Sequence, residues 1–479
     1  MVFISITSFL ICKFARILKE RKSKEFINMS NDIRIKRGLN LKLKGVAEKT
    51  VSEAPKSKFY AIKPTDFHQV TPKMVLKEGA TVEAGDVLFF SKYSDSVKFT
   101  SPVSGTLKEI RRGAKRRILE VIVEADDKNA FKEFGKKDPS KMESSEVKEH
   151  LLASGCWPFI RQRPYDVIAN PADKPKAIFV SAYATAPLAA DIAFVLDGRE
   201  DDFQSGINAL RKLTEGPVHL SVSKNETSFL KDVKGVTLHQ FQGPHPAGNV
   251  GVQIHHIDPI SAGERVWVIN PEDVAIIGAL FNKGKFEASR VIAVAGSEIK
   301  NPKYYRAIIG SQVSGYVYDA GVNTPDNIRI ICGDVLTGDA VSPDGYLSFY
   351  ATLISVIPEG KEYRLFGWIP FKDNNIPSMS RTSLSWLFPN KRYEVNTNLN
   401  GEERALVVTG EMEKVFPMDI FPMQLLKECM AGNIEKMENL GIYEVAPEDF
   451  CLVDYTNTSK IEAQEIIRDG LDLMIKEVG

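Results

Sequence analysis

An aromatic ring and a proton donor stand side by side in a short segment that two prolines enclose. Phe67 and His68 lie between Pro64 and Pro72. A phenyl ring can stack on a flat ligand, and an imidazole can donate a hydrogen bond to a carbonyl oxygen. The pair could therefore hold a quinone ring and bond its carbonyl, although a surface loop is the simpler interpretation.

The other histidines and the cysteines offer little metal chemistry. His245 lies in a loop stiffened by two prolines, which indicates a structural turn, with a partner or ligand contact as the alternative. His255 and His256 are adjacent, so on a strand they would face opposite sides and could not share an ion. Five cysteines occur without a Cys-x-x-Cys pair. The pattern argues against a metal site, a disulfide framework or an iron–sulfur cluster held by this chain alone, and it favours free thiols in a reducing cytoplasm.

Basic side chains crowd one predicted β-hairpin, namely Lys108, Arg111, Arg112, Lys115, Arg116 and Arg117. A solvated turn is the default interpretation. Docking to an acidic partner is the functional alternative, with Arg111, Arg112, Lys115, Arg116 and His245 as candidates. Lys plus Arg and Asp plus Glu both number 62, so the net charge is zero and broad nucleic-acid binding is not predicted.

No set of side chains predicts catalysis or a bound nucleotide. No Gly-x-Gly-x-x-Gly follows a predicted strand, and the segment 278–286 has the wrong spacing for a phosphate loop, with Phe286 where Ser or Thr must bind magnesium. Glu78 to Thr81 resembles a covalent-flavin motif, but Glu78 stands where Ser or Thr is expected. We therefore expect no catalytic residue, no metal and no covalent flavin in this chain.

The elements that must position these residues begin with a biotinyl- or lipoyl-type hammerhead. Its turns fall at Glu78-Gly79, Glu83–Asp86 and Ser101–Gly105, where glycine reaches positive φ without steric cost. A working carrier also needs a lysine at the hairpin tip, which the spacing places at 93–96. That stretch has none, and Lys92 and Lys98 fall outside it, so the sequence predicts the carrier fold without its swinging arm. A biotin- or lipoyl-type carrier remains the alternative function, to be tested by intact mass.

The pattern of apolar and polar residues divides the rest of the chain into further segments. The length of the chain predicts about three or four domains. Residues 176–302 alternate strands and helices, which predicts a Rossmann-like α/β domain without a nucleotide motif. Within the β-rich segment that follows, Tyr316–Tyr318 is expected to be a strand. We predict these segments: 1–28, an N-terminal extension; 29–130, the hammerhead domain; 131–175, a linker with a helix; 176–302, the α/β domain; 303–365, a β-grasp-like domain; 366–416, a β-rich segment that completes the first domain; and 417–479, a C-terminal helical domain.

The N-terminal extension differs from the rest of the chain. The apolar run Val2–Ala15 precedes several basic residues and is too short to cross a bilayer, which takes about 20 apolar residues. It also lacks the features of a signal peptide. Either it is a membrane-surface anchor, or the reading frame opens too early and Met29 is the true start.

Several further stretches carry a family resemblance from Met29 to the C-terminus. The chain resembles the α subunit, NqrA, of Na⁺-translocating NADH:quinone reductases in Ile33–Leu39, Val97–Gly105 (VKFTSPVSG), Arg112–Arg116 (RGAKR), Arg161–Pro164, Gly243–Gly248 (GPHPAG), Phe366–Trp368 and Glu413–Asp419 (EKVFPMD). The plan is also similar to the electron-input subunits of the related Rnf complex and of respiratory NADH dehydrogenase. Those chains bind flavin and an iron–sulfur cluster, but Asn457–Lys460 lacks the expected cluster cysteine.

The resemblance implies a role within a larger complex. Such complexes pass electrons from NADH through flavins and iron centres to quinone and pump Na⁺ outward. The α subunit is implied to be a cofactor-free, peripheral cap on the cytoplasmic face of the bacterial inner membrane, held by five other subunits and associated with quinone. The same resemblance places Phe67, His68, Phe131 and Phe134 in segments that approach quinone. An independent nucleotide-dependent enzyme is the rival class, which an NADH titration would test.

Overall fold

A computed structural model describes residues 31–361, 377, 379 and 385–479. The predicted extension 1–28 and part of the predicted segment 366–416 lie outside these residues. In the described part of the chain, no helix is both long enough and apolar enough to span a bilayer.

The largest sheet has seven strands and forms the α/β layer. Its order is β1 (Asn31–Arg34), β14 (Thr237–Gln242), β13 (Val218–Ser223), β12 (Ile178–Ala182), β15 (Val266–Ile269), β10 (Arg161–Arg163) and β11 (Val167–Ile168). The first five strands are parallel, and β10 and β11 are each antiparallel to their neighbours. The central strands are buried along nearly their whole length because both faces of a parallel sheet are covered.

Helices connect these strands, as the predicted alternation of strands and helices requires. They are α3 (Ile192–Val195), α4 (Glu200–Leu213), α5 (Val250–Ile257) and α6 (Pro271–Lys283). In α4, three acidic residues begin the helix and the buried Phe203, Ile207 and Leu210 share one face. His255 and His256 lie in helix α5, so the condition under which the sequence argument considered them, a strand, does not apply. Their run of apolar neighbours fits either element, and the helix follows from packing against the sheet.

Residues 59–125 fold into two small sheets that enclose an aromatic core. One has the order β3 (Phe59–Ile62), β9 (Ile118–Ala125), β8 (Gly105–Arg112) and β5 (Thr81–Val82), and the other β4 (Pro72–Met74), β6 (Val87–Ser91) and β7 (Ser94–Thr100). The rings of Phe89 and Phe99 stack in the core at 4.6 Å between centroids. At Gly105, where φ is +156°, a Cβ would come 2.0 Å from a backbone oxygen of Glu124, so this turn requires glycine.

The hairpin tip differs from the prediction. Ser91 pairs with Ser94, so the turn consists of Lys92 and Tyr93 rather than residues 93–96. A register shift between Phe90 and Ser91 moves the turn toward the N-terminus, which spacing alone does not reveal. A lysine therefore stands at the tip after all.

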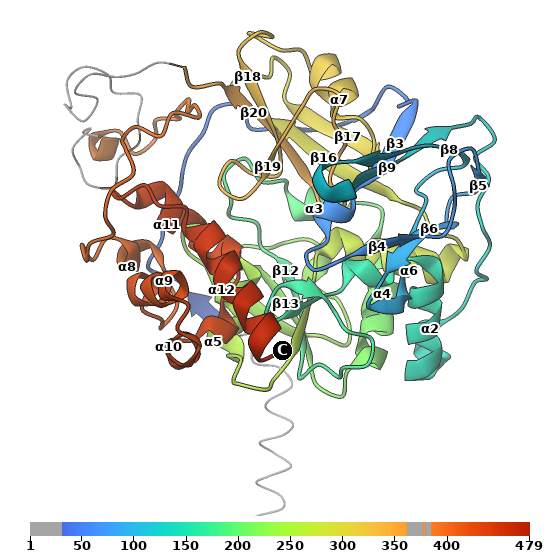
Figure 1. Cartoon of the computed structure of the whole chain (residues 1–479), viewed down its shortest axis with the longest axis horizontal. Helices are drawn as coiled ribbons and strands as arrows, with labels where there is room; N and C mark the ends of the chain where they lie inside the picture. The colour runs from blue at the N-terminus through green and yellow to red at the C-terminus, as the bar shows by residue number, and fades with distance from the viewer. Residues whose placement is uncertain (1–30, 362–376, 378, 380–384) are drawn as a thin grey trace, which may run out of the picture.

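A third sheet lies at the top of the view in Figure 1. Its order is β19 (Asp339–Val341), β18 (Ile328–Cys332), β20 (Leu353–Pro358), β16 (Ser289–Ala295), β17 (Lys303–Ile308) and β2 (Glu48–Glu53). The prediction of a strand at Tyr316–Tyr318 is wrong, because these residues lie within helix α7 (Val313–Ala320). Val313, Tyr316, Val317 and Ala320 are buried at helical spacing, a pattern that a three-residue window cannot separate from a strand.

Helix α2 (Ser144–Ser154) confirms the helix predicted within the linker 131–175. The remaining α-helices form a C-terminal group. That group contains α8 (Met412–Val415), α9 (Pro422–Ala431), α10 (Ile434–Asn439), α11 (Cys451–Thr456) and α12 (Ala463–Glu477). Figure 1 shows it gathered on one side, with α12 running past β12 and β13.

Strand partners cross the boundaries drawn from the sequence. Strands β1 and β2 belong to the segment 29–130 but pair with β14 and β17, and β16 belongs to 176–302 but pairs with β17 and β20. In the described residues of 366–416 there is no strand, only the isolated bridge of Tyr393 to Leu43. Strand pairing joins residues far apart in the chain, so a division by local pattern cannot place these strands.

Candidate functional site

A cavity of about 550 Å³ opens at the carboxyl ends of the parallel strands. Ser181 lies near the end of β12 and Tyr183 follows that strand, Asn249 precedes α5, and Asn270 and Glu272 stand at the start of α6. The opposite wall comes from the third sheet and the C-terminal region. Its members include Cys332, Asp334, Tyr350, Leu353, Glu448 and Gln464.

The position of the cavity follows from the strand order. The chain leaves β12 toward β13 and β14 on one side, and later returns as β15 on the other side. The connections therefore diverge at β12 and leave a crevice outside the strand ends. This is where open α/β sheets bind ligands.

One wall holds an arginine between an acid and an aromatic ring. Arg161 donates to Asp166 at 3.2 Å, and its guanidinium lies 5.3 Å from the centroid of the Tyr350 ring. Burial opposes ionisation of Asp166, but the charges of Arg161 and Arg163 lower its pKa below the ordinary value. The Tyr350 hydroxyl donates to the backbone oxygen of Pro158 at 2.6 Å, and burial raises its pKa. The wall is thus a fixed cation and a neutral phenol.

Glu272 is the polar group of the cavity with spare bonding capacity. It is 4% exposed, and one carboxyl oxygen accepts the backbone N–H of Val291 at 3.1 Å. The other oxygen is buried without a hydrogen-bond partner. Burial raises the pKa of Glu272 to about 7, against the opposing charge of Arg290. Near neutral pH this carboxyl is therefore partly protonated, and its protonated form has a hydrogen-bond donor.

The cavity is not built for a phosphate or a metal ion. The loop after β12, residues 183–190, has no glycine that would let its backbone cradle a pyrophosphate. Among the described residues, no three His, Cys, Asp or Glu side chains are grouped to hold a metal ion. The arginine, the buried acid and the aromatic ring of the wall suit a ligand that accepts hydrogen bonds.

The predicted pair Phe67 and His68 does not line this cavity. Phe67 is 3% exposed and packs on Phe99 and Phe349, with ring centroids 4.5 and 4.9 Å away. It also contacts the ring of Tyr350 at 5.8 Å, so it supports the cavity wall from behind. His68 is half-buried, and its Nε2 lies 2.6 Å from a carboxylate oxygen of Asp472.

Phe131 and Phe134 lie elsewhere, beside the Ala84–Gly85 turn of the barrel. Phe131 forms a bridge with Ala84, and the amine of Lys285 lies 4.3 Å from the centroid of its ring. Phe134 donates its backbone N–H to Gly284 at 2.7 Å. Both rings are half-buried, and neither lines the cavity.

The candidate docking residues separate into exposed and buried groups. Arg111, Arg112, Lys115 and Arg116 are exposed on the β8–β9 hairpin. His245 is 2% exposed, and its ring contacts the Thr185 hydroxyl at 3.1 Å and the Cys451 sulfur at 3.3 Å. Burial lowers the pKa of His245 to about 4 and raises that of Cys451, so both are neutral. The histidine therefore fits the structural-turn interpretation, not a partner contact.

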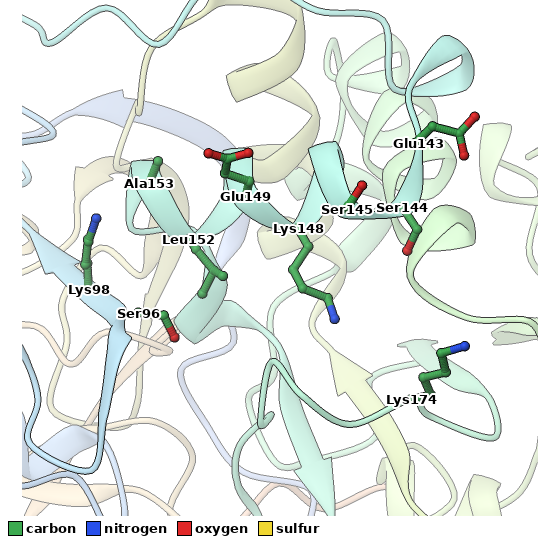
Figure 2. Close-up of a pocket in the computed structure, with 10 residues that line it drawn as sticks. All are labelled: Ser96, Lys98, Glu143, Ser144, Ser145, Lys148, Glu149, Leu152, Ala153 and Lys174. Atoms are coloured by element: carbon green, nitrogen blue, oxygen red, sulfur yellow. The ribbon is translucent and has the colours of Figure 1, made fainter.

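A second hollow, of about 690 Å³, lies open along α2. Figure 2 shows its residues spread along the helix, with Lys98 and Lys174 toward opposite ends. Its charged residues are solvated, and none has a buried polar atom without a partner. It has the character of an ordinary surface depression.

Sequence reasoning missed the residues that form the cavity. Arg161 appears only inside a family stretch, and Asp166, Glu272 and Tyr350 are not singled out. One local signal could have found part of the site, because Asn270-Pro271-Glu272 follows directly after a buried strand. The opposite wall begins only at Cys332, 60 positions after Glu272, and leaves no local signal.

Comparison with known proteins decides the family. Residues 33–126 match the NqrA N-terminal barrel-sandwich hybrid domain, residues 142–286 the NqrA second alpha/beta domain, and residues 291–342 the NQRA C-terminal domain. The chain belongs to the NqrA family. The matches confirm the predicted barrel-sandwich and α/β domains.

NqrA relatives match over their full length. The NqrA subunit of the Na(+)-translocating NADH-quinone reductase of Yersinia pseudotuberculosis is 35% identical over 449 residues, which are 93% of this chain and 100% of that protein. The corresponding subunits of Neisseria meningitidis and Pasteurella multocida are each 36% identical over 448 residues, with the same coverage. A chain of an NAD⁺-reducing [NiFe]-hydrogenase has a TM-score of 0.34 and 13% identity over 64% of this chain and 55% of that chain.

Proposed function

We propose that this chain works as the NqrA subunit of a Na⁺-translocating NADH:quinone reductase, where it is a cofactor-free scaffold that also contacts quinone. It sits peripherally on the cytoplasmic face of the bacterial inner membrane, held by five other subunits. The observation that carries the proposal is the end-to-end match to subunits of that name. Within this scaffold, the six-stranded sheet, which joins β2 and β16 to the predicted segment 303–365, acts as a β-grasp-like domain, and residues 417–479 act as a helical domain.

The cavity is the proposed quinone site. A volume of about 550 Å³ suits a ring with part of its tail. A quinone ring has two carbonyl oxygens that accept hydrogen bonds. Protonated Glu272 and the guanidinium of Arg161 could donate to them, and the ring of Tyr350 offers an apolar face. Electrons would come from flavins on other subunits of the complex.

The segment predicted to contact quinone enters this proposal indirectly. Asp66 lines the cavity, while the neighbouring Phe67 ring supports Tyr350 from behind. The segment around residues 64–72 therefore shapes the site without supplying its contact surface. Phe131 and Phe134 have no part in the proposed site.

Filling the cavity tests the proposal. Ala184 lines the cavity and is exposed to it, so Ala184→Phe should obstruct a quinone ring without burying a new charge. In the assembled complex, we expect a quinone KM raised about tenfold, since one lost ring contact and one hydrogen bond together contribute on the order of 1–2 kcal/mol. NADH oxidation with an artificial acceptor should not change. Ala153→Phe, in the open hollow along α2, is the matched control. Unaltered quinone kinetics in a fully assembled Ala184→Phe complex would contradict the proposed site.

A carrier function is the second candidate, and the position of Lys92 favours it. The lysine occupies the turn between β6 and β7, where a carrier domain holds its prosthetic group. Intact mass of the native chain tests it. A biotin or lipoyl increment that Lys92→Arg abolishes would support a carrier, and an unmodified mass would remove the idea.

A further inference from the structure

The end of β8 and the connection to β9 carry four cations that no acidic group of the described residues neutralises. They are Arg112, Lys115, Arg116 and Arg117, all exposed. The acidic residues of this hairpin lie nearer the base of the hairpin and already have partners. Glu120 pairs with Arg111 at 2.6 Å, and Glu124 pairs with Lys108 at 3.1 Å. Within the described residues, none of the four cations forms an ion pair. The tip is therefore a concentrated positive charge facing solvent.

The backbone of the tip adopts a conformation that ordinary residues rarely take. Lys115 and Arg116 have φ of +53° and +62°. Two successive left-handed non-glycine residues are unfavourable, and such outliers cluster at functional segments. The strained turn is closed by the Gly113 N–H, which donates to the backbone oxygen of Arg117 at 2.8 Å. The geometry fixes the cations on one short turn.

The tip lacks what a protein partner would need. Stable protein interfaces have an apolar or aromatic centre, with charges kept to the rim. In this hairpin, residues 105–125 of the described chain, no large apolar side chain is strongly exposed. A lipid surface makes no such demand, because clusters of four or more Lys and Arg are attracted to anionic headgroups by charge alone.

We propose that this hairpin tip, Arg112 with Lys115, Arg116 and Arg117, rests on the anionic phospholipid headgroups of a bilayer. The contact goes beyond the proposed function, since it needs neither quinone nor any other subunit. It would orient the chain at the membrane by charge, without any inserted segment.

Vesicle binding by the full chain tests the proposal. The probes are phosphatidylcholine vesicles with and without phosphatidylglycerol, pelleted at low and at high salt. The test variant replaces all four cations with glutamine. The matched control replaces four exposed lysines elsewhere: Lys136, Lys231, Lys300 and Lys427. Residues 1–28 are common to every protein compared, so their contribution cancels.

We expect the wild-type protein to bind the anionic vesicles, to release them at high salt, and not to bind the neutral vesicles. The tip variant should lose affinity for anionic vesicles about tenfold or more, given the attraction of each cation near the surface. The control should bind as wild type, and thermal unfolding should be alike in all three. Undiminished vesicle binding by a folded tip variant would overturn the proposal.

An all-lysine tip separates charge from shape. Replacing Arg112, Arg116 and Arg117 with lysine keeps the charge but removes the bidentate geometry of guanidinium. Retained binding to anionic vesicles supports a lipid surface. Loss of vesicle binding in this variant would overturn the proposal. Tighter binding of wild type to polyglutamate or to duplex DNA than to vesicles would also overturn it, and would assign the tip to a protein or nucleic-acid partner.

Discussion

The imidazole Nε2 of His68 lies 2.6 Å from a carboxylate oxygen of Asp472. This contact joins the loop after β3 to the last helix, α12, across 404 positions of sequence. Both side chains are about one-third exposed, so solvent weakens the pair without removing it. His68, predicted as a ligand contact, is thus a link between the first and last parts of the described chain.

Asp472→Asn should loosen this link. An exposed pair of this kind contributes up to about 1 kcal/mol, so we expect amides of α12 to exchange hydrogen up to about five-fold faster. Hydrogen exchange with mass spectrometry measures this. Asp469→Asn, at an exposed position of the same helix, is the control. Equal exchange in both variants would show that the His68 contact does not hold α12.

Phe67→Ala should destabilise the fold rather than alter a ligand contact. The ring is 3% exposed among Phe99, Phe349 and Tyr350, so its loss leaves a cavity. The free energy of unfolding should fall by about 3–5 kcal/mol, as for other buried phenylalanines. Denaturant titration measures the loss. Phe421→Ala is the control, because that ring is 63% exposed. A variant as stable as wild type would place Phe67 outside the core.

His150 should make stability depend on pH. The ring is 4% exposed, and burial, helped by the charge of Lys137, lowers its pKa from 6.5 to about 4. A lowered pKa means that the unfolded chain binds the proton first, so stability is full above pH 6.5 and is lost as the pH falls toward 4. Relative to His150→Leu, wild type should lose about 3 kcal/mol across that window.

The measurement is the difference between unfolding free energies of wild type and His150→Leu at several pH values. Taking a difference cancels the opposite contribution of Glu272, whose raised pKa acts in the same window. Val147→Ala, at a buried position of the same helix without a titratable group, should differ from wild type by a constant amount. A constant difference for His150→Leu as well would contradict a buried neutral imidazole.

The purified chain should be colourless. No glycine-rich loop follows β12 to hold a flavin phosphate, and the cysteines lack the spacing that binds a cluster. Absorption spectra and metal analysis of the isolated chain test this. Flavin or iron at one equivalent per chain would contradict the cofactor-free role.

Local rules predict the fold best where an element carries its own signals. Helix α6 begins with Pro271 at its first position and is followed by Gly284 in a left-handed conformation, so both ends are legible in sequence. Helix α7 has only eight residues and neither a proline nor a capping side chain at its start, and its tyrosines and valines suggest a strand. Lys92 reaches the hairpin tip through a register shift that spacing cannot show.

The candidate site is less predictable because its walls meet only in the folded chain. Arg161 and Tyr350 are 189 positions apart, yet the guanidinium lies 5.3 Å from the ring centroid. Phe67 and Tyr350 meet in the same way. The sequence shows that Phe67 is aromatic, but only long-range packing shows that it supports the wall from behind.

Strands β1 and β2 also bear on how the protein is made. They leave the ribosome early, but their partners β14 and β17 end at Gln242 and Ile308. Domains generally fold during synthesis as their own residues emerge. The seven-stranded and six-stranded sheets each contain a first strand, β1 or β2, that was synthesised long before the strand with which it pairs. The first strands must stay unpaired through about half of translation, so the nascent chain carries two exposed strand edges that a chaperone would have reason to cover.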